Sequence, residues 1–189
     1  MSLKADVLIV GAGGMGALFG SILQAGGLNV VLQDANLEHV EAIRREGLQI
    51  KGFGGDRKVK ITAISDPSQI QSADLLLFQC KGNASRDAAQ QVKHLTRQGA
   101  VCISFQNGLG NEEVIAEEVG PKNVLGGLTT MAGFMTGPGQ IHDFSRVPSY
   151  IGEMEGGISE RSKLIAEKLS KAGLETHAVP NIQLEIWKI

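Results

Sequence analysis

The sequence predicts an α/β fold with a doubly wound, mostly parallel sheet, and three observations carry this prediction. Short apolar runs of strand length alternate with segments whose apolar residues recur at helical spacing. The runs at 7–10 and 28–32 are apolar on both faces, as strands covered on both sides require. The first run ends in a cluster of glycines that leads directly into a helical pattern. A sheet with helices on both faces follows from this rhythm.

The expected elements follow in order along the chain. Strands are predicted at 7–10, 28–32, 75–79 and 101–105, and helices at 15–24, 37–45, 84–95 and 112–118. Residues 48–51 and 59–64 alternate around glycines, which predicts a hairpin beside the sheet. The final third is expected to hold some antiparallel strands, at 124–131 and 139–144, joined through a Gly137-Pro138-Gly139 turn. A helix at 159–172 with Ser159 as N-cap and Gly173 as its stop is followed by a strand at 175–179, and Asn181 then caps a last helix.

Length and composition limit the function classes. With 189 residues, of which 42% are hydrophobic, the chain can bury one full core. A net charge of -2 and a pI near 6.1 provide no basic surface for nucleic acid. The longest apolar runs fall far short of the roughly 20 residues that span a bilayer, and residues 1–4 lack the build of a signal peptide. We therefore expect a cytoplasmic protein with no nucleic-acid or membrane partner.

Cys80 and Cys102 each follow an apolar run that predicts a buried strand. Neither cysteine lies in a metal-ligand spacing. We expect two small buried thiols and no metal site.

The glycine cluster has the spacing of a dinucleotide-binding turn. Gly11, Gly13 and Gly16 form G-x-G-x-x-G between a strand and a helix, with Gly14 and Met15 inside the motif. The first glycine permits the tight turn, the second lets a pyrophosphate approach the backbone, and the third lets the helix pack closely on the strand. The helix N-terminus then faces the phosphates. This indicates a Rossmann-type domain that binds NAD(P) through these five residues; the alternative is a structural turn without a ligand.

Asp34 closes the second strand, where an acidic side chain hydrogen-bonds the ribose hydroxyls of NAD. No Arg or Lys occurs from 29 to 40, so the cation that usually meets a 2′-phosphate is missing there. Taken alone, this favours NADH, although Lys81 is a candidate to supply the charge from elsewhere. The alternative is an exposed loop aspartate.

Lys81 and Asn107 follow the strands at 75–79 and 101–105. Both therefore stand at carboxyl ends of parallel strands, where doubly wound folds bind ligands. The alternatives are a solvated surface lysine and an ordinary Asn-Gly turn. Four further polar residues are expected to serve packing, the surface or a helix start rather than catalysis: Thr129, His142, Glu112 and Glu113.

Several motifs agree, in order, with one enzyme family. They are the glycine motif, Gln79-Cys80-Lys81, Gln106-Asn107-Gly108-Leu109-Gly110, Gly137-Pro138-Gly139-Gln140-Ile141-His142 and Ile186-Trp187-Lys188. Together they cover nearly the whole chain and resemble the ketopantoate reductases (2-dehydropantoate 2-reductases).

The resemblance implies a two-domain NADPH-dependent oxidoreductase that reduces 2-dehydropantoate, a small 2-oxo acid, to pantoate on the route to pantothenate and coenzyme A. It places Lys81 and Asn107 against the cofactor and the reacting end of the site. A lysine beside the tryptophan of the interdomain helix protonates the carbonyl in the family, and Lys188 would be that acid. The family generally has this lysine two positions after the tryptophan, where this sequence has Ile189, and one helical step turns the side chain by about 100°.

The resemblance also implies a domain organisation. Residues 1–180 would form the NAD(P)-binding domain and residues 181–189 the start of the interdomain helix, with the helical substrate domain absent from this chain. The isolated domain is then expected to be inactive, and the full-length protein to form a homodimer. An exposed apolar patch is predicted near Leu184, Ile186 and Trp187. The alternatives are a reductase of another 2-oxo acid or of an imine, and a non-catalytic NAD(P)-sensing module.

Overall fold

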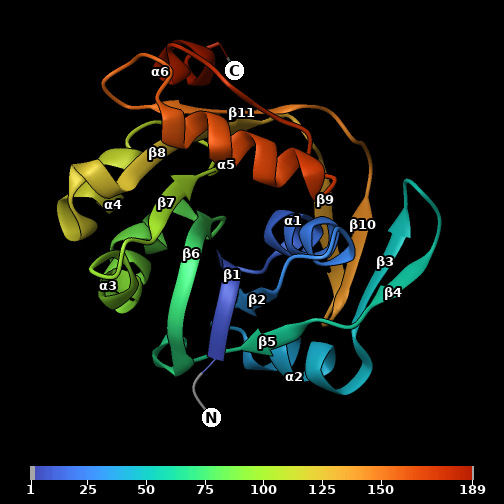
Figure 1. The fold of residues 1–189 in the computed structure, drawn as a ribbon. Coiled ribbons are helices and arrows are strands. Elements are labelled where there is room, and N and C mark those ends of the chain that lie inside the picture. Colours follow the sequence, from blue (N-terminus) through green and yellow to red (C-terminus); the bar gives the residue numbers. More distant parts are fainter. Residues whose placement is uncertain (1–2, 189) are drawn as a thin grey trace.

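A computed structural model describes residues 3–188 and contains the predicted α/β architecture (Figure 1). The main sheet has eight strands in the order β12-β11-β8-β7-β6-β1-β2-β5. Strands β8, β7, β6, β1, β2 and β5 are mutually parallel, whereas β11 is antiparallel to β8 and carries β12 parallel to itself. Their bounds are β1 (Leu3–Val10), β2 (Val30–Gln33), β5 (Thr62–Ile64), β6 (Ile70–Phe78), β7 (Val101–Ser104), β8 (Val124–Thr129), β11 (Ser149–Glu153) and β12 (Thr176–Ala178). The mostly parallel sheet with antiparallel strands in the last third is confirmed.

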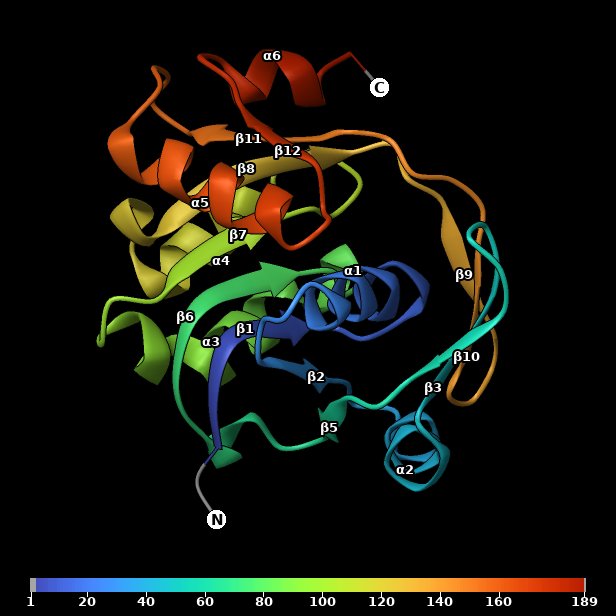
Figure 2. The same ribbon diagram turned by 45° about the vertical axis from the view of Figure 1, so that its right-hand side comes forward.

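Helices cover both faces of this sheet (Figures 1 and 2). On one face lie α1 (Gly14–Ala25) and α5 (Glu160–Lys171), and on the other lie α3 (Ser85–Thr96) and α4 (Asn111–Val119). Helix α2 (Leu37–Glu46) packs beside the edge strand β5, and the short α6 (Ile182–Ile186) packs on β8 and β11. Three single 3₁₀ turns, η1 (Pro67–Gln69), η2 (Gly82–Ala84) and η3 (Pro121–Asn123), lead into β6, α3 and β8.

The core divides into two layers because side chains alternate along each buried strand. In β1, Val7 and Ile9 pack with α1 and α5, whereas Leu8 and Val10 pack with α3 and α4. All four side chains are at most 1% exposed. The continuous apolar runs of the sequence therefore reflect burial on both faces.

A second sheet of four strands, in the order β4-β3-β10-β9, packs beside α1. Its strands are β3 (Leu48–Gly52), β4 (Arg57–Val59), β9 (Gly133–Gly137) and β10 (Gln140–Asp143). The expected hairpin is real for β3 and β4. Its extension to residue 64 is wrong, because Thr62–Ile64 leaves the hairpin and pairs with β2 at the edge of the main sheet as β5.

The turn at Gly137-Pro138-Gly139 also joins different strands from those expected. It connects β9 to β10, whereas β8 ends at Thr129 within the main sheet. Strands β9 and β11 were not predicted from the sequence, because both are short and contain glycines and polar residues. Both the β9–β10 and the β8–β11 pairs are antiparallel, as expected for this part of the chain.

The ends of the later helices agree with the sequence signals. The Ser159 side chain accepts a hydrogen bond from the Ser162 amide at the start of α5, and Gly173 follows that helix with φ +90°. Asn181 caps α6 by accepting from the Leu184 amide at 3.0 Å.

Within residues 3–188, no helix has both the length and the apolar character needed to cross a membrane. Over the same residues, no group of three or more potential metal-ligating side chains gathers.

Candidate functional site

The glycine-rich turn lies at the carboxyl edge of the parallel strands, between β1 and α1. The Gly11 amide donates to the Gln33 carbonyl at 2.9 Å, and the Gln79 amide donates to the Val10 carbonyl at 2.9 Å. These bonds fix the turn between the ends of β2 and β6. Gly13 is the N-cap of α1 without any side-chain cap, so the first amides of this helix remain available to a ligand.

The three motif glycines differ in what surrounds them. Gly11 has φ +95°, and a Cβ there would overlap the backbone of Cys80. At Gly16 a Cβ would overlap the Gly11 carbonyl oxygen and lie 3.0 Å from Cγ2 of Ile9. A Cβ at Gly13 would instead meet no heavy atom within 4 Å. Gly11 and Gly16 therefore hold the turn together, while Gly13 leaves open space at the helix N-terminus that fits a pyrophosphate.

Gly14 and Met15 also have structural roles. A Cβ at Gly14 would overlap the backbone of Phe134 and come within 2.8 Å of the Gly133 carbonyl oxygen. The bare backbone of Gly14 therefore allows β9 to pack against the start of α1. Met15, the second residue of α1, is half-buried, and its side chain packs against the core layer that contains α1. It therefore has a packing role in addition to any contact with a ligand.

Asp34 directly follows β2 and is half-buried at the same edge. Its Oδ1 accepts a hydrogen bond from the Asn36 amide at 2.9 Å. No ion pair found within residues 3–188 includes Asp34. The carboxylate can therefore accept further hydrogen bonds from the hydroxyls of a ribose.

Lys81 and Asn107 leave the adjacent strands β6 and β7 at this edge, and both are exposed. Lys81 begins the 3₁₀ turn η2, where its carbonyl accepts from the Ala84 amide at 2.8 Å. Because the Gly11 turn packs on the backbone of Cys80, the residue before Lys81, the structure brings the glycine turn and this lysine segment together.

Buried polar side chains form hydrogen bonds that hold the segments following β6 and β7. Nε2 of Gln106 donates to the Cys80 carbonyl and to Oγ of Ser85, each at 2.8 Å. Nδ2 of Asn111 donates to the Asn107 carbonyl at 3.1 Å and to the Gly108 carbonyl at 3.2 Å. Gln106 belongs to one of the sequence motifs but was not predicted to have a role, and its position directly before Asn107 was the available signal.

Burial disfavours the ionised forms of both cysteines and of Glu112, so none of these three groups is an activated nucleophile. Burial raises the pKa of the Cys102 thiol to about 12, and burial also raises the pKa of Cys80. Glu112 and Glu113 open α4 as expected, but Glu112 is only 3% exposed. Burial raises the pKa of Glu112, which makes this carboxyl unlike an ordinary solvated helix-start residue.

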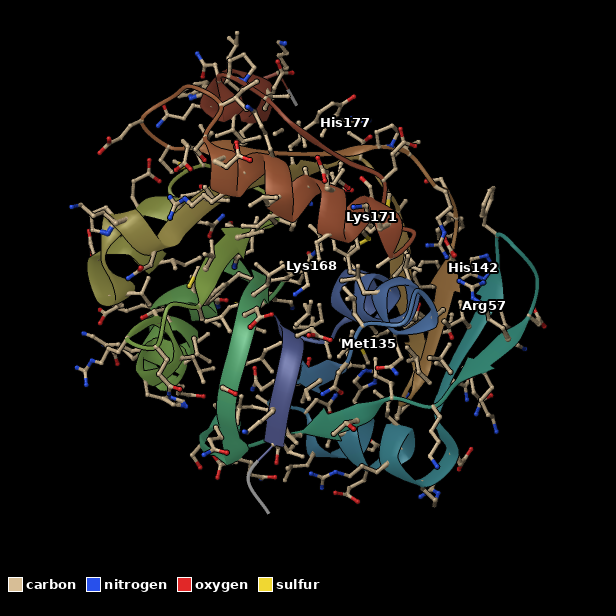
Figure 3. All side chains as sticks on the ribbon, viewed as in Figure 1. Arg57, Met135, His142, Lys168, Lys171 and His177 are labelled. Carbon is tan, nitrogen blue, oxygen red and sulfur yellow. The ribbon has the colours of Figure 1, made fainter. Side chains whose placement is uncertain are left out.

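His142 and Thr129 make packing contacts in agreement with the sequence analysis. His142 lies on the second sheet (Figure 3). Its ring packs in a cluster with the rings of Phe134 and Phe144, whose centroids are 5.9 Å and 4.6 Å from its own and 5.3 Å from each other. Oγ1 of Thr129 accepts from Oγ of Ser149 at 3.1 Å across the β8–β11 pair. Neither residue therefore calls for a catalytic role.

Lys188 lies just beyond α6, with its Nζ 2.8 and 2.9 Å from the two carboxylate oxygens of Glu185. The side chain of Lys188 is 57% exposed, and Leu184 and Trp187 are 53% and 71% exposed. The apolar patch predicted on this helix is thus present for these two residues, and Ile186 is half-buried. Ile189, which occupies the family's usual lysine position, lies outside the described residues.

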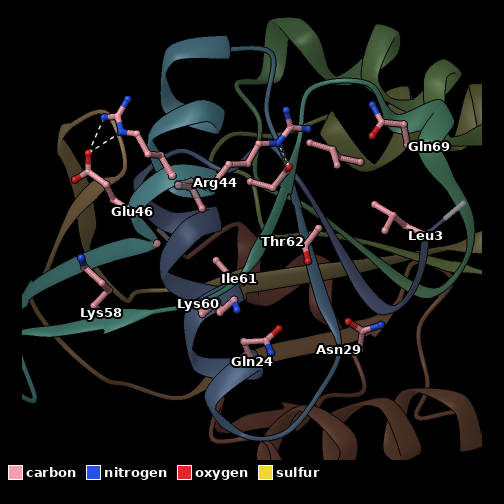
Figure 4. Close-up of a pocket in the computed structure, with 15 residues that line it drawn as sticks. Leu3, Gln24, Asn29, Arg44, Glu46, Lys58, Lys60, Ile61, Thr62 and Gln69 are labelled. Carbon is pink, nitrogen blue, oxygen red and sulfur yellow. Dashed lines mark hydrogen bonds and ion pairs between the residues drawn. The ribbon is translucent and has the colours of Figure 1, made fainter. Parts of the chain in front are cut away.

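A cavity of about 730 Å³ (Figure 4) is lined by residues outside the glycine turn. It lies beside α2 and β5 and reaches Leu3, which begins β1, and Asn29, which precedes β2. These residues mark the amino ends of the parallel strands, opposite to the edge that holds Gly13. The cavity is therefore separate from the candidate cofactor site.

Comparisons with known proteins agree with this geometry. Residues 7–156 match the family model described as Ketopantoate reductase PanE/ApbA. The chain is 33% identical over 181 residues to a 2-dehydropantoate 2-reductase of Archaeoglobus fulgidus, and 33% identical over 185 residues to one of Halobacterium salinarum. These alignments cover 96% of this chain but only 58% and 60% of the relatives, so the chain spans about three-fifths of their length.

Solved structures show the same similarity. A D-mandelate dehydrogenase in complex with NADH and anilino(oxo)acetate aligns with a TM-score of 0.90 and 29% identity, over 98% of this chain and 60% of that one. A 2-dehydropantoate 2-reductase from Geobacter metallireducens aligns with a TM-score of 0.88 and 27% identity, over 98% of this chain and 61% of that one. The similarity thus extends across essentially the whole chain and includes a structure that holds a nicotinamide cofactor.

Proposed function

This chain belongs to the ketopantoate reductase family, and from that premise we propose that it is the cofactor-binding part of an enzyme that reduces 2-dehydropantoate to pantoate. The observation that carries the proposal is the open space over Gly13, at the uncapped start of α1. Amide donors and a positive helix end meet there, which suits a pyrophosphate. Residues 1–180 would form the cofactor domain, and residues 181–189 would begin the connection to a substrate domain.

The cofactor contacts follow from the edge at which the residues lie. The amides at Gly13, Gly14 and Met15 would hold the pyrophosphate, and the Asp34 carboxylate would accept from ribose hydroxyls. Lys81 would add positive charge beside the same edge. Because no Arg or Lys occurs from 29 to 40, NADH is the cofactor favoured by the strand end at Asp34, while the family resemblance favours NADPH with Lys81 as the compensating charge.

The proposed reaction reduces a ketone to an alcohol with one hydride and one proton. When bound, the reduced nicotinamide supplies the hydride to the carbonyl carbon. Asn107, at the end of β7, would orient the reacting groups through hydrogen bonds. Lys188 is the proposed proton donor to the developing alkoxide, since an ammonium in a closed cleft stabilises and protonates that oxygen. It would have to exchange its pairing with Glu185 for the substrate oxygen.

A second candidate substrate has a specific observation in its favour. The D-mandelate dehydrogenase noted above shares this fold at a TM-score of 0.90 and was solved with NADH. A different 2-oxo acid, used with NADH, is consistent with that similarity and with the lack of Arg or Lys from 29 to 40 around Asp34. Substrate recognition would then lie largely in the remaining two-fifths of the relatives' length.

Two measurements test the proposal. Fluorescence titration of the 189-residue chain with NADH and NADPH should show binding, with the ratio of the two Kd values reporting the preference at Asp34. Initial rates of NADH and NADPH oxidation should then be measured for a protein that contains this chain at the length of its relatives. The substrates would be 2-dehydropantoate and a panel of other 2-oxo acids, and Lys188→Ala would test the proton donor.

The outcomes separate the alternatives. If the protein reduces 2-dehydropantoate and Lys188→Ala strongly lowers the rate, the result supports the reductase function and Lys188 as the proton donor. Equal rates in the variant exclude Lys188 from that role. Activity with another 2-oxo acid alone favours the second candidate. Cofactor binding with no reduction of any substrate would favour an NAD(P)-sensing module.

A further inference from the structure

His39, a residue of α2, contacts two segments that are distant in sequence. Its side chain is fully buried. Nε2 lies 2.8 Å from the carbonyl oxygen of Ala12, in the middle of the glycine motif, and Nδ1 accepts from the amide of Gly139 at 3.0 Å. The imidazole thus connects the glycine turn, α2 and the β9–β10 turn of the second sheet.

The two partners determine the tautomer of this ring. The Gly139 amide can only donate and the Ala12 carbonyl can only accept. Nδ1 must therefore be without a proton, and Nε2 must carry the proton that is donated to Ala12. Both nitrogens of the neutral ring are satisfied in a site that excludes water, where an unmade hydrogen bond is costly.

The elements on either side of His39 are firmly held. The His39 amide donates to Oδ1 of the N-cap residue Asn36 at 3.2 Å, which fixes the first turn of α2. Gly139 has φ +69°, and a Cβ there would lie 3.0 Å from Cβ of Ala42, so the β9–β10 turn packs closely on the same helix. His39 therefore acts from a rigid support rather than from a loop.

The bond to Ala12 has a direct consequence for the candidate phosphate site. The Ala12 carbonyl and the Gly13 amide belong to one planar trans peptide, so they point in opposite directions. When His39 holds the carbonyl, the Gly13 N–H is directed away from the ring. Gly13 is the residue with open space around it at the start of α1.

We propose that His39 is a positioning residue for the dinucleotide cofactor, because its hydrogen bond to the Ala12 carbonyl sets the peptide whose Gly13 amide faces the pyrophosphate. This inference rests on the proposed cofactor function. It assigns His39 no contact with substrate or cofactor. Its effect is on cofactor affinity, and it adds the β9–β10 turn to the support of the cofactor site.

The test compares NADH and NADPH binding by the 189-residue chain and three variants, using fluorescence titration. His39→Phe fills the space without either hydrogen bond, and we expect its Kd to rise roughly tenfold. His39→Gln keeps a donor and an acceptor on one side chain, and its Kd should lie closer to that of the parent. His94→Phe is the matched control, since His94 also bonds a carbonyl, that of Ile70 at 3.0 Å, but far from the glycine turn.

Circular dichroism at the temperature of the titration shows whether each variant is folded, so a loss of affinity can be separated from a loss of fold. A folded His39→Phe that binds the cofactor like the parent overturns the inference, as does a His39→Gln no better than His39→Phe. If the unmodified chain binds neither cofactor, the proposed function fails and this inference fails with it. Binding by the parent with unchanged affinity in His39→Phe overturns the role of His39 alone.

A second measurement covers the case in which His39→Phe does not fold. Nitrogen-15 NMR of the imidazole rings in the parent chain reports which ring nitrogen carries the proton. We expect His39 to be the Nε2–H tautomer and its Nε2 signal to shift when the cofactor is added, while the signals of His94 remain in place. A Nδ1–H tautomer, or a His39 signal that does not respond to bound cofactor, would contradict the proposed role.

Discussion

Gly13 and Gly16 offer a paired test of the cofactor site, because the structure gives the two glycines different reasons to lack a side chain. Gly13→Ala places a methyl group in open space, whereas Gly16→Ala places one against the Gly11 carbonyl and the Ile9 side chain. We expect both variants to bind NADH and NADPH at least about tenfold more weakly, which is about 1.4 kcal/mol. Only Gly16→Ala is expected to lose stability as well.

The stability difference can be worked out from the local geometry. In a helix interior, alanine is normally favoured over glycine by about 1 kcal/mol, so any destabilisation of Gly16→Ala must come from the overlap. Overpacking costs about 1–3 kcal/mol or more, and the Gly11 carbonyl is backbone that cannot rotate away. A net loss of about 2 kcal/mol would lower Tm by about 4–8 °C in a chain of this size.

Gly13→Ala should behave differently. Gly13 has φ -61°, a value that alanine adopts, and the substitution restricts the unfolded chain, which stabilises by about 0.4–1 kcal/mol. Alanine is a poorer N-cap than glycine, which offsets this gain. The Tm of Gly13→Ala should therefore lie close to that of the parent. Thermal unfolding by circular dichroism, followed by fluorescence titration of each folded variant, measures both quantities. Unimpaired cofactor binding by Gly13→Ala would refute the placement of the pyrophosphate, and an unchanged Tm for Gly16→Ala would refute the packing argument.

Two further predictions concern buried carboxyl groups. Asp143→Ala should lower the free energy of unfolding by about 3 kcal/mol in urea titrations. The Asp143 side chain is fully buried, and its Oδ2 pairs with Arg57 at 2.9 Å and with Arg146 at 2.8 Å, so its loss leaves both guanidinium groups without a carboxylate partner. Glu112→Gln should raise stability at pH 8, measured the same way. Burial raises the folded-state pKa of Glu112 above its ordinary value of 4.5. The contribution of Glu112 to the free energy of unfolding is therefore fully present below pH 4.5 and is lost as the pH rises through the folded-state pKa, so at pH 8 the neutral Gln is favoured.

Surface residues supply the controls for these two substitutions. Glu41 pairs with Arg44 at 2.6 Å but is 61% exposed, so Glu41→Ala should cost less than about 1 kcal/mol. An Asp143→Ala variant no less stable than Glu41→Ala would contradict the first prediction. Glu113 is the exposed neighbour of Glu112. If Glu113→Gln changes the pH dependence of stability as much as Glu112→Gln does, burial is not the cause.

Local patterns determined the framework of the fold and the position of the glycine turn. Apolar runs identified the central strands, since residues buried on both faces must be apolar throughout. Gly11, Gly13 and Gly16 could be assigned because the need for a bare backbone depends on the turn itself and on the helix that follows it. The caps Ser159 and Asn181 were likewise correct, since a cap bonds an amide only three residues away.

Long-range pairing decided the parts that the sequence did not reveal. The run at 59–64 alternates continuously, yet it divides between two sheets because β4 pairs with β3 while β5 pairs with β2. Strand β10 lies parallel to β3, which places Gln140 beside Gln49 although about half of the chain separates them. No periodicity within either segment encodes its partner, because alternation fixes the face of a strand and not its neighbour.

The residues of the candidate site, and those that hold them in place, show the same contrast between local and long-range determinants. The sequence by itself determined that a glycine turn, Asp34, Lys81 and Asn107 each follow the carboxyl end of a strand, because the residue at which a strand ends is a local property. Only the tertiary structure decided that Gln106 holds the loops beneath and that His39 links Ala12 to Gly139. Those contacts join residues that are 21 to 100 positions apart, and their hydrogen bonds exist because folding excludes water from both partners at once.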